Sequence, residues 1–384
     1  MKNIALYPFN KITKGLIKFR DLIDARIGAV IDFTIDSRDH VEWKLLQEDS
    51  LGIFLTNNLE EGLEGIDTLI LNDTGTPFGN SQSAYQKFDL TQMWRKLVLY
   101  AAHRGITVIS VHEITDADTR RWLQAHDIEL HVDQQLNADM LSEMSQHYNL
   151  QDDTEIGTYL KHFELDQRLL DSSPSILKVA IFATRGCLGK FTTQMSIYRE
   201  LTHRGRATTA IITEPTAFLF QQPGADIMKF LSQQTLAQYP YYIHALVQKA
   251  EQAGAEIVLM AGQGSLLPNH NFIIASTKLA YLSAYQPDVT LLVVGYDDDD
   301  RIQDCLDVLR IYGNQKKPHR LLLPNRIEIG FGEYDIRSEA EMNERKQELE
   351  RKFNIEVEFV LHADKVVDEM EALIDEKKIT VSVS

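Results

Sequence analysis

Short apolar runs alternate with amphipathic segments along most of the chain, and this alternation restricts the possible folds more than any other feature of the sequence. Apolar runs of roughly four to eight residues are typical of buried strands, whereas an apolar stripe with a period of about 3.6 residues is typical of helices. A chain that alternates the two forms parallel sheets with helices on both faces. Because 384 residues suffice for two cores of ordinary size, we expect an α/β protein with two domains.

The first domain is predicted over residues 1–135 as a Rossmann-like domain. We expect strands at 4–7, 27–33, 68–71, 107–111 and 129–132. Helices are expected at 90–103 and 116–125. The first strand runs into Pro8-Phe9-Asn10-Lys11 and lacks the turn G-x-G-x-x-G that admits a pyrophosphate. We therefore predict that this domain binds no nicotinamide cofactor; it binds another ligand or none.

The second half of the chain is predicted to hold a linker, a second domain and an extension. Residues 136–174 are polar and acidic and are expected to form the linker. The second domain, at 175–330, is expected to have strands at 179–182, 208–212, 256–260, 289–294 and 320–323 and helices at 192–203, 241–252, 272–284 and 301–312. Residues 331–384 are expected to form a helix-strand-helix extension, whose first helix starts with Ser338 and Glu341 as a capping box.

The bulk properties exclude several classes of function. A formal net charge of −17 repels nucleic acid backbones and anionic lipid, so neither nucleic acid nor a membrane is an expected partner. The first residues lack the apolar core and cleavage site of a signal peptide, and no apolar stretch has the length of a membrane span. The only two cysteines, Cys187 and Cys305, fit a reducing compartment. The cytoplasm is the expected location.

The segment most informative about function is KVAIFATRGCLGKFTT, residues 178–193, in which a buried strand runs through a loop into an amphipathic helix. A P-loop requires this context, because main-chain N–H groups and the helix dipole bind phosphate oxygens while a lysine, here Lys190, reaches the terminal phosphates. The match to G-x-x-x-x-G-K-[ST] is imperfect: Thr184 replaces the first glycine, Phe191 replaces the hydroxyl residue, and Thr192 comes one position late. The alternative is an ordinary strand-loop-helix connection that contains Gly-Lys.

A second glycine-rich turn, GQGSLL at residues 262–267, follows the strand expected at 256–260. Open α/β sheets bind ligands at the carboxyl ends of their strands, so this turn and the loop at 184–190 are expected to face one crevice. We therefore predict that residues 175–330 form a P-loop NTPase-like domain, with no catalytic residue and no metal ligand assigned. The residues predicted to bind the phosphorylated cofactor are Thr184, Arg185, Gly186, Gly189, Lys190, Thr192, Gln263, Gly264 and Ser265.

With these motifs the sequence resembles the two-domain family that includes the D-glutamate N-acetyltransferases, whose P-loop domain is related to dethiobiotin synthetase. The family pattern G-T-D-C-x-V-G-K-M-T corresponds to ATRGCLGKFT at residues 183–192, E-G-Q-G-S-L to AGQGSL at 261–266, and T-G-Q-T to TEPT at 213–216. The first domain is similar around residues 65–70 and 105–113, so the resemblance extends to about residue 295. It implies the same two-domain fold and makes acyl transfer from coenzyme A a candidate reaction.

Two positions depart from this family pattern in a way that affects metal binding. Arg185 stands where the family has an acidic residue, and Ala261 stands where it has a glutamate. Because magnesium in nucleotide sites is usually held by one or two carboxylates, the loss of both predicts weak magnesium binding, and Arg185 is a candidate to neutralise phosphate charge directly. Replacement carboxylates are available at Asp297–Asp300, Glu214 and Asp226, but for each of them a capping or surface role is the expected one.

Two further positions carry reactive side chains. Cys187 is either a nucleophile activated by the helix N-terminus or a small residue that fits a tight loop. His112 and Glu113, after the strand expected at 107–111, either face the domain interface or end the strand. In both cases the structural role is the expected one.

The opening segment ALYPFNKITKGLIKFRDL, residues 5–22, is similar to proteins of clostridial peptide-maturation systems. This narrower resemblance implies a role in modifying a ribosomally made precursor peptide, in a natural-product pathway. It assigns no reaction to any residue.

Two interpretations of function from different classes follow. In the first, the protein binds ATP or another phosphorylated nucleotide, or coenzyme A, and acts as a ligase, a kinase-like enzyme or an acyl-transfer enzyme on a small acid or a peptide. In the second, it is a catalytically degenerate P-loop protein that binds a precursor peptide or a partner enzyme. The loss of two carboxylates favours the second, whereas the retention of Gly189, Lys190 and Thr192 favours the first. A homo-oligomer is expected in either case.

Overall fold

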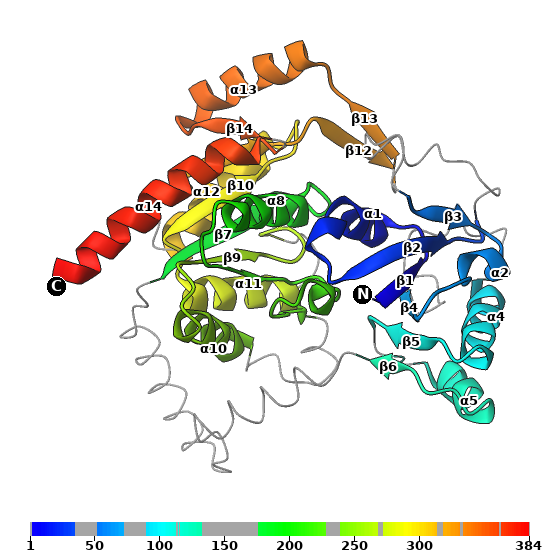
Figure 1. Ribbon diagram of the computed structural model, residues 1–384. Coiled ribbons are helices and arrows are strands. Elements are labelled where there is room, and N and C mark those ends of the chain that lie inside the picture. The colour runs from blue at the N-terminus through cyan, green and yellow to red at the C-terminus, as the bar shows by residue number, and fades with distance from the viewer. Residues whose placement is uncertain are drawn as a thin grey trace. The chain divides into compact units, whose positions relative to one another are not determined.

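The computed structural model describes residues 2–34, 52–72, 90–112, 114, 116–132, 176–227, 239–267, 272–312, 318–330, 333–360 and 362–383 (Figure 1). The chain divides into two compact units, Met1–Leu136 with Phe218–Gln221, and Asn137–Ala217 with Gln222–Ser384. Each unit is built on a parallel six-stranded sheet, which confirms the predicted α/β class. The linker predicted at residues 136–174 lies outside the described residues. Within the described ranges, no helix combines the length and the apolar character that a membrane crossing requires.

The sheet of the first unit has the strand order β3-β2-β1-β4-β5-β6. Its strands are β1 (Lys2–Tyr7), β2 (Ala25–Ile31), β3 (Phe54–Thr56), β4 (Thr68–Leu71), β5 (Thr107–Ser110) and β6 (His131–Val132). Its helices are α1 (Lys11–Lys18), α2 (Leu59–Gly62), α4 (Leu90–His103) and α5 (Ala117–Ala125), with a 3₁₀ turn at Arg20–Leu22. All pairings are parallel, and the order 3-2-1-4-5-6 is that of the dinucleotide-binding Rossmann fold.

The connection from β1 to α1 is closed by side chains of the unit itself. Asn10 caps α1 by accepting from the N–H groups of Ile12 and Thr13, both at 3.0 Å. The buried carboxylate of Asp32, which follows β2, accepts the N–H of Phe9 at 3.0 Å and the hydroxyl of Thr34 at 2.6 Å. In nicotinamide-binding Rossmann domains, a carboxylate roughly 20 residues beyond the first turn holds a ribose hydroxyl. Here the carboxylate of Asp32 instead holds the loop between β1 and α1. The absence of nicotinamide binding stays a prediction.

The sheet of the second unit has the order β14-β11-β10-β7-β9-β8, also parallel throughout. Its strands are β7 (Leu177–Ala183), β8 (Thr208–Ile211), β9 (Ile257–Ala261), β10 (Val289–Val293), β11 (Arg320–Leu323) and β14 (Val357–Phe359). Its helices are α8 (Lys190–His203), α10 (Tyr239–Gln252), α11 (Phe272–Tyr285), α12 (Asp299–Tyr312), α13 (Glu339–Phe353) and α14 (Ala363–Val383). A 3₁₀ turn at Ala217–Phe220 falls mostly in Phe218–Gln221, which belong to the first unit. A hairpin, β12 (Arg326–Gly330) with β13 (Glu333–Ile336), stands apart from the sheet.

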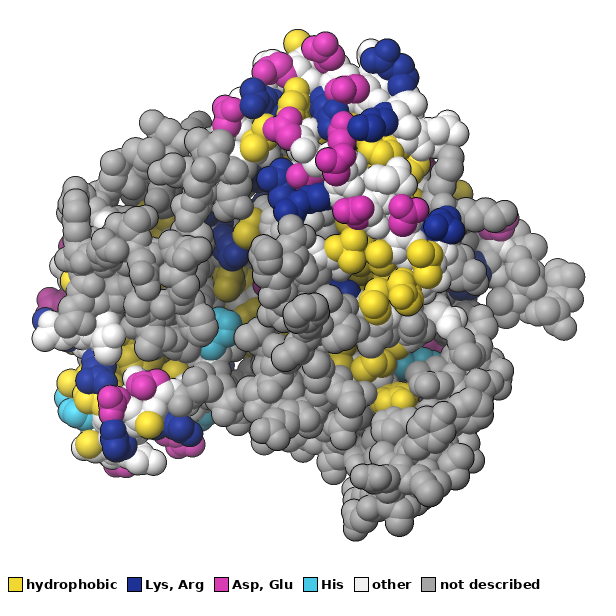
Figure 2. Space-filling view, turned by 180° about the vertical axis from the view of Figure 1, so that it is seen from behind, with side chains coloured by type: hydrophobic (Ala, Val, Ile, Leu, Met, Phe, Trp, Pro, Cys, Tyr) yellow, Lys and Arg dark blue, Asp and Glu magenta, His cyan; other side chains and the backbone are white. Residues whose placement is uncertain are grey.

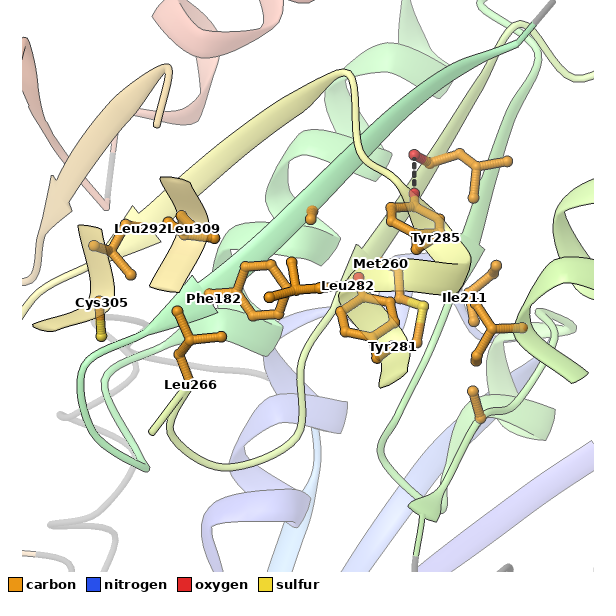
Figure 3. Packing of buried hydrophobic residues seen from close by; sticks show 14 of the residues in the cluster. Phe182, Ile211, Met260, Leu266, Tyr281, Leu282, Tyr285, Leu292, Cys305 and Leu309 are labelled. Carbon is orange, nitrogen blue, oxygen red and sulfur yellow. Dashed lines mark hydrogen bonds between the residues drawn. The ribbon is translucent and has the colours of Figure 1, made fainter. Parts of the chain in front are cut away.

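The two faces of this sheet pack into different apolar clusters, because successive strand residues point to opposite sides. Phe182 of β7 packs with Tyr281, Leu282 and Tyr285 of α11 on one face, where the ring centroids of Phe182 and Tyr281 lie 5.3 Å apart (Figure 3). On the other face, neighbouring residues of β7 pack with α8 and α14. The P-loop strand is therefore buried on both sides.

Residues 331–384 belong to the same compact unit as the P-loop strand. The capping box predicted at the start of α13 is present: Ser338 accepts from the N–H of Glu341, whose carboxylate accepts from the N–H of Ser338 at 2.9 Å. At the end of the molecule that holds α13, basic and acidic side chains are interspersed on the surface (Figure 2). Strand β14 pairs with β11 and so extends the sheet itself.

Candidate functional site

The phosphate loop predicted from sequence connects the central strand β7 to α8. Gly189 caps α8 with a φ of 103°, a left-handed conformation that favours glycine, and it gives the helix no side-chain cap. The first helical hydrogen bond runs from the N–H of Thr193 to the Gly189 oxygen at 2.8 Å. A helix N-terminus without a side-chain cap, at the carboxyl edge of a parallel sheet, has the geometry that binds anions.

Lys190 is the first residue of α8 and is only 9% exposed. A largely buried lysine therefore stands in the first turn of α8, at the positive end of the helix dipole. Gly186 and Cys187 are exposed in the loop, and Cys187 has a φ of 60°. Thr192, predicted as the late hydroxyl residue, is half-buried in the first turn. The next hydroxyl, of Thr193, donates to the Gly189 oxygen at 3.0 Å.

The start of the loop is tied to the residues that follow β10. The buried carboxylate of Asp298 accepts through Oδ2 from the Thr184 hydroxyl at 2.6 Å, from Arg185 Nε at 2.8 Å and from the Gly295 N–H at 3.2 Å. Thr184 is itself buried, and its hydroxyl also accepts from Gly295. Arg185, a candidate to neutralise phosphate, thus forms an ion pair within the protein, and its side chain is 36% exposed.

The four aspartates after β10 have different environments. Asp297 and Asp300 are exposed, Asp298 lies within the loop network, and Asp299 binds Arg345 and Lys352 of α13. Burial raises the pKa of Asp299, but hydrogen bonds from Lys352 and Arg345 lower it below its usual value. In the part of the chain that the structure describes, no group of three or more His, Cys, Asp or Glu side chains is arranged to hold a metal ion.

The second glycine-rich turn lies directly beside the phosphate loop. The N–H groups of Gly262 and Leu266 donate to the oxygens of Ile181 and Ala183 in β7, at 2.9 and 2.8 Å. A Cβ atom at Gly262 would lie 2.9 Å from the ring of Phe182, so this close approach requires glycine. The two glycine-rich segments therefore follow adjacent strands, β7 and β9, and lie side by side at one edge of the sheet.

The three predicted residues of this turn, Gln263, Gly264 and Ser265, have different surroundings. The Gln263 side chain donates to Asp226 at 3.2 Å and accepts from the N–H of Ile227 at 3.2 Å. Gly264 is exposed with a φ of 70°, and Ser265 is half-buried. Asp226, a candidate from sequence, is thus held by Gln263 at the same edge of the sheet.

Lys278 is the site residue that sequence reasoning missed. It lies on α11, is 4% exposed, and donates from Nζ to the main-chain oxygen of Gln263. Burial lowers the pKa of Lys278 well below its ordinary value, the positive charge of Lys190 lowers it further, and the negative charge of Glu214 raises it. A single charged residue in the apolar helix FIIASTKLAYLSAY was the available signal.

The loop after β8 lies at the same edge of the sheet as the two glycine-rich segments. The Thr213 hydroxyl donates to the oxygen of Ala261 at 2.9 Å, so the TEPT segment contacts the end of β9. Glu214 is half-buried and interacts electrostatically with Lys278. Ala261, at the end of β9, is buried and offers no carboxylate. In the first unit, His112 is half-buried and its main-chain oxygen accepts the Ser110 hydroxyl at 2.6 Å, while Glu113 lies outside the described residues.

The strand order, the left-handed Gly189 and the uncapped start of α8 are features of a P-loop domain, and a known family has the same domain. Residues 171–319 match the DUF1611 P-loop domain. The family description reads "Domain of unknown function (DUF1611_C) P-loop domain", and the prediction of a P-loop domain is confirmed. No curated protein matches the chain.

Among solved structures, the chain is similar to a crystal structure of a DUF1611 family protein from Anabaena variabilis ATCC 29413. The TM-score is 0.62 at 14% sequence identity, over 96% of this chain and 98% of that chain, which shows a shared fold. Chloroplast FtsY from Physcomitrella patens gives a TM-score of 0.33 at 11% identity, over 73% of this chain and 82% of that one. A nucleotide-binding protein in complex with ADP from Archaeoglobus fulgidus gives 0.31 at 12% identity, over 53% and 92%.

Proposed function

We propose that the P-loop domain binds ATP or another phosphorylated nucleotide at the N-terminus of α8, with coenzyme A as the alternative ligand through its phosphates. The observation that supports this most is the burial of Lys190, 9% exposed, at a helix start that Gly189 leaves without a side-chain cap. A cation at the positive end of a helix dipole is unfavourable by up to about 1 kcal/mol. A bound phosphate reverses the sign of that interaction.

We further propose that the bound ligand serves group transfer to a small acid or a peptide, in a cytoplasmic peptide-maturation or natural-product pathway. Phosphoryl transfer and ATP-dependent ligation depend mainly on positioning and charge neutralisation, which Lys190 and the main-chain amides of the loop supply. Acyl transfer would use the same groups to hold the phosphates of coenzyme A. The family resemblance at residues 183–192 and 261–266, and that of residues 5–22, supports this assignment.

Ligand binding is proposed to depend only weakly on magnesium. The end of β9 carries Ala261 in place of a carboxylate, and the nearby Asp298 carboxylate already binds Arg185 and Thr184. Phosphate charge is then offset by lysines of the protein more than by a metal. Ala261→Glu is expected to raise the magnesium dependence of nucleotide binding, measured by calorimetry with magnesium or with a chelator.

A degenerate binding protein is the second candidate, and the loss of acidic residues at Arg185 and Ala261 is the observation that favours it. Both functions require the phosphate site, so they differ in turnover. Release of ADP or phosphate from ATP, or of free coenzyme A from acetyl coenzyme A, in the presence of candidate acids and peptides would support the enzyme. Binding without any release would support the binding protein.

The decisive experiment is calorimetry with ATP, ADP and acetyl coenzyme A on wild type and Lys190→Ala. We expect the variant to lose a charge-assisted contact of roughly 1.5–3 kcal/mol, which is about a 10- to 150-fold weaker affinity. Its thermal unfolding without ligand should be unchanged or slightly improved, since the unfavourable dipole interaction is removed. Lys96→Ala, on an exposed position of α4, is the matched control. Equal ligand affinity in wild type and Lys190→Ala would refute the proposed site.

A further inference from the structure

Lys278 is buried more deeply than Lys190, although it is the only charged side chain of α11. Its Nζ atom lies under the turn after β9: it donates to the Gln263 oxygen, and it lies 3.5 Å from the point that a Cβ of Gly262 would occupy. The amine is therefore at contact distance from the turn that lies beside the phosphate loop. Three apolar neighbours of the turn, Phe182, Leu266 and Tyr281, are fully buried.

The burial of Lys278 has no evident structural benefit. Among the described residues, one carbonyl oxygen accepts a hydrogen bond from this amine, which has two or three hydrogens to donate. Burying a charged ammonium without an ion pair is costly. The charged groups that act on it are Lys190 from α8, which repels it, and Glu214 after β8, which attracts it. Burial and the charge of Lys190 both lower the pKa of Lys278, which favours the loss of its proton in the ligand-free protein.

The balance of charge changes when a polyanion binds. A phosphate group beside Lys190 brings two or more negative charges near Lys278, and opposite charge favours the protonated form of a nearby amine. Two lysines would then bind the phosphate from two sides. Lys190 would lie at the start of α8, and Lys278 would lie under the turn at residues 262–265.

We propose that Lys278 is a second phosphate-binding lysine, which takes up one proton from solvent when the phosphorylated ligand binds beside Lys190. This inference rests on the proposed function and adds a residue and a protonation step to it. The amine and the proton form the ammonium, with no other bond made or broken. The ligand is therefore bound together with a proton.

The test is calorimetry of the full chain with ATP at about pH 8.5, where the terminal phosphate is already ionised, in two buffers of different ionisation enthalpy. Wild type is expected to take up close to one proton per ATP bound. In Lys278→Met the uptake should vanish and the affinity should fall at least tenfold, whereas Lys96→Met should behave as wild type. Lys278→Gln, which is polar but cannot be charged, replaces the methionine variant if that variant unfolds.

The outcomes separate the two proposals. If wild type binds ATP, needs Lys190 to do so, and shows neither proton uptake nor any loss of affinity in Lys278→Met or Lys278→Gln, the role of Lys278 alone is overturned. If wild type binds neither ATP nor coenzyme A, the proposed function fails and this inference falls with it. Proton uptake that disappears only when Lys278 is changed supports both.

Discussion

The carboxylate of Asp298 is predicted to hold the phosphate loop in place, and Asp298→Ala tests this. Three hydrogen bonds converge on its Oδ2 atom, from Thr184, Arg185 and the Gly295 N–H. Their loss is partly offset, because the Gly295 N–H still donates to the Thr184 hydroxyl at 3.1 Å and the Arg185 side chain is 36% exposed to water.

The magnitude follows from these partners. A broken, fully buried ion pair costs about 3–5 kcal/mol, and a lost hydrogen bond to a charged group costs about 1.5–3 kcal/mol. Because Arg185 reaches solvent, the lower range applies, and we expect a loss of about 2 kcal/mol. For a unit of this size each kcal/mol lowers Tm by about 2–4 °C, so the expected decrease is roughly 4–8 °C.

The assay is thermal unfolding of the full chain, followed by circular dichroism. Asp297→Ala is the matched control, since this neighbouring aspartate is exposed, and its effect should stay within about 0.5 kcal/mol. A double-mutant cycle with Arg185→Ala should give a coupling free energy of roughly 1–2 kcal/mol. If Asp298→Ala and Asp297→Ala unfold at the same temperature, the network does not stabilise the loop and the reasoning is refuted.

Three more predictions concern the same unit. Gly262→Ala should destabilise it by about 1–3 kcal/mol in denaturant unfolding, because the new Cβ would lie 2.9 Å from the buried ring of Phe182; Gly264→Ala, with open space but a φ of 70°, should cost about 1 kcal/mol. Arg206→Met should loosen α14 by about 1 kcal/mol, less at high salt, because Arg206 binds Glu371 and Asp375; a salt-independent effect would contradict this. Burial raises the pKa of Glu358, but hydrogen bonds from the Phe359 N–H, Lys365 and His362 lower it to about 2. Its stabilising contribution is therefore complete above the ordinary value of 4.5 and is lost as the pH falls toward 2, so Glu358→Gln should flatten the acid side of a stability-pH curve.

Much of the fold is predictable because the apolar runs coincide with buried strands. The expected strand at 68–71 and helix at 90–103 are β4 and α4 to the residue, and the strand at 320–323 is β11. Sequence reasoning missed α1, β3 and the hairpin β12–β13. Strand β3 has three residues, too few to show a period of two, and α1 contains a glycine within only eight residues.

The candidate site was predictable only where the residues are close in sequence. Gly189 and Lys190 form a recognisable motif because the loop and the helix start are local features. The contact of Lys278 with Gln263 joins a helix to a preceding turn, and the bond from Thr184 to Asp298 spans 114 positions. Such pairings depend on which strands are neighbours in the sheet, which single-sequence periodicity does not determine.

The position of α14 has a consequence for how the protein is made. Val367, Met370 and Ile374 of this helix complete the apolar cluster on the α8 face of the sheet. They leave the ribosome about 180 residues after β7, which at roughly 5–20 residues per second is a delay of about 10–35 s. The other strands of the sheet, β8 to β14, are made within the same interval, and the α8 face stays incompletely covered until α14 follows them. Because transiently exposed apolar surface favours aggregation, Val367, Met370 and Ile374 protect the newly made sheet only once α14 has been synthesised.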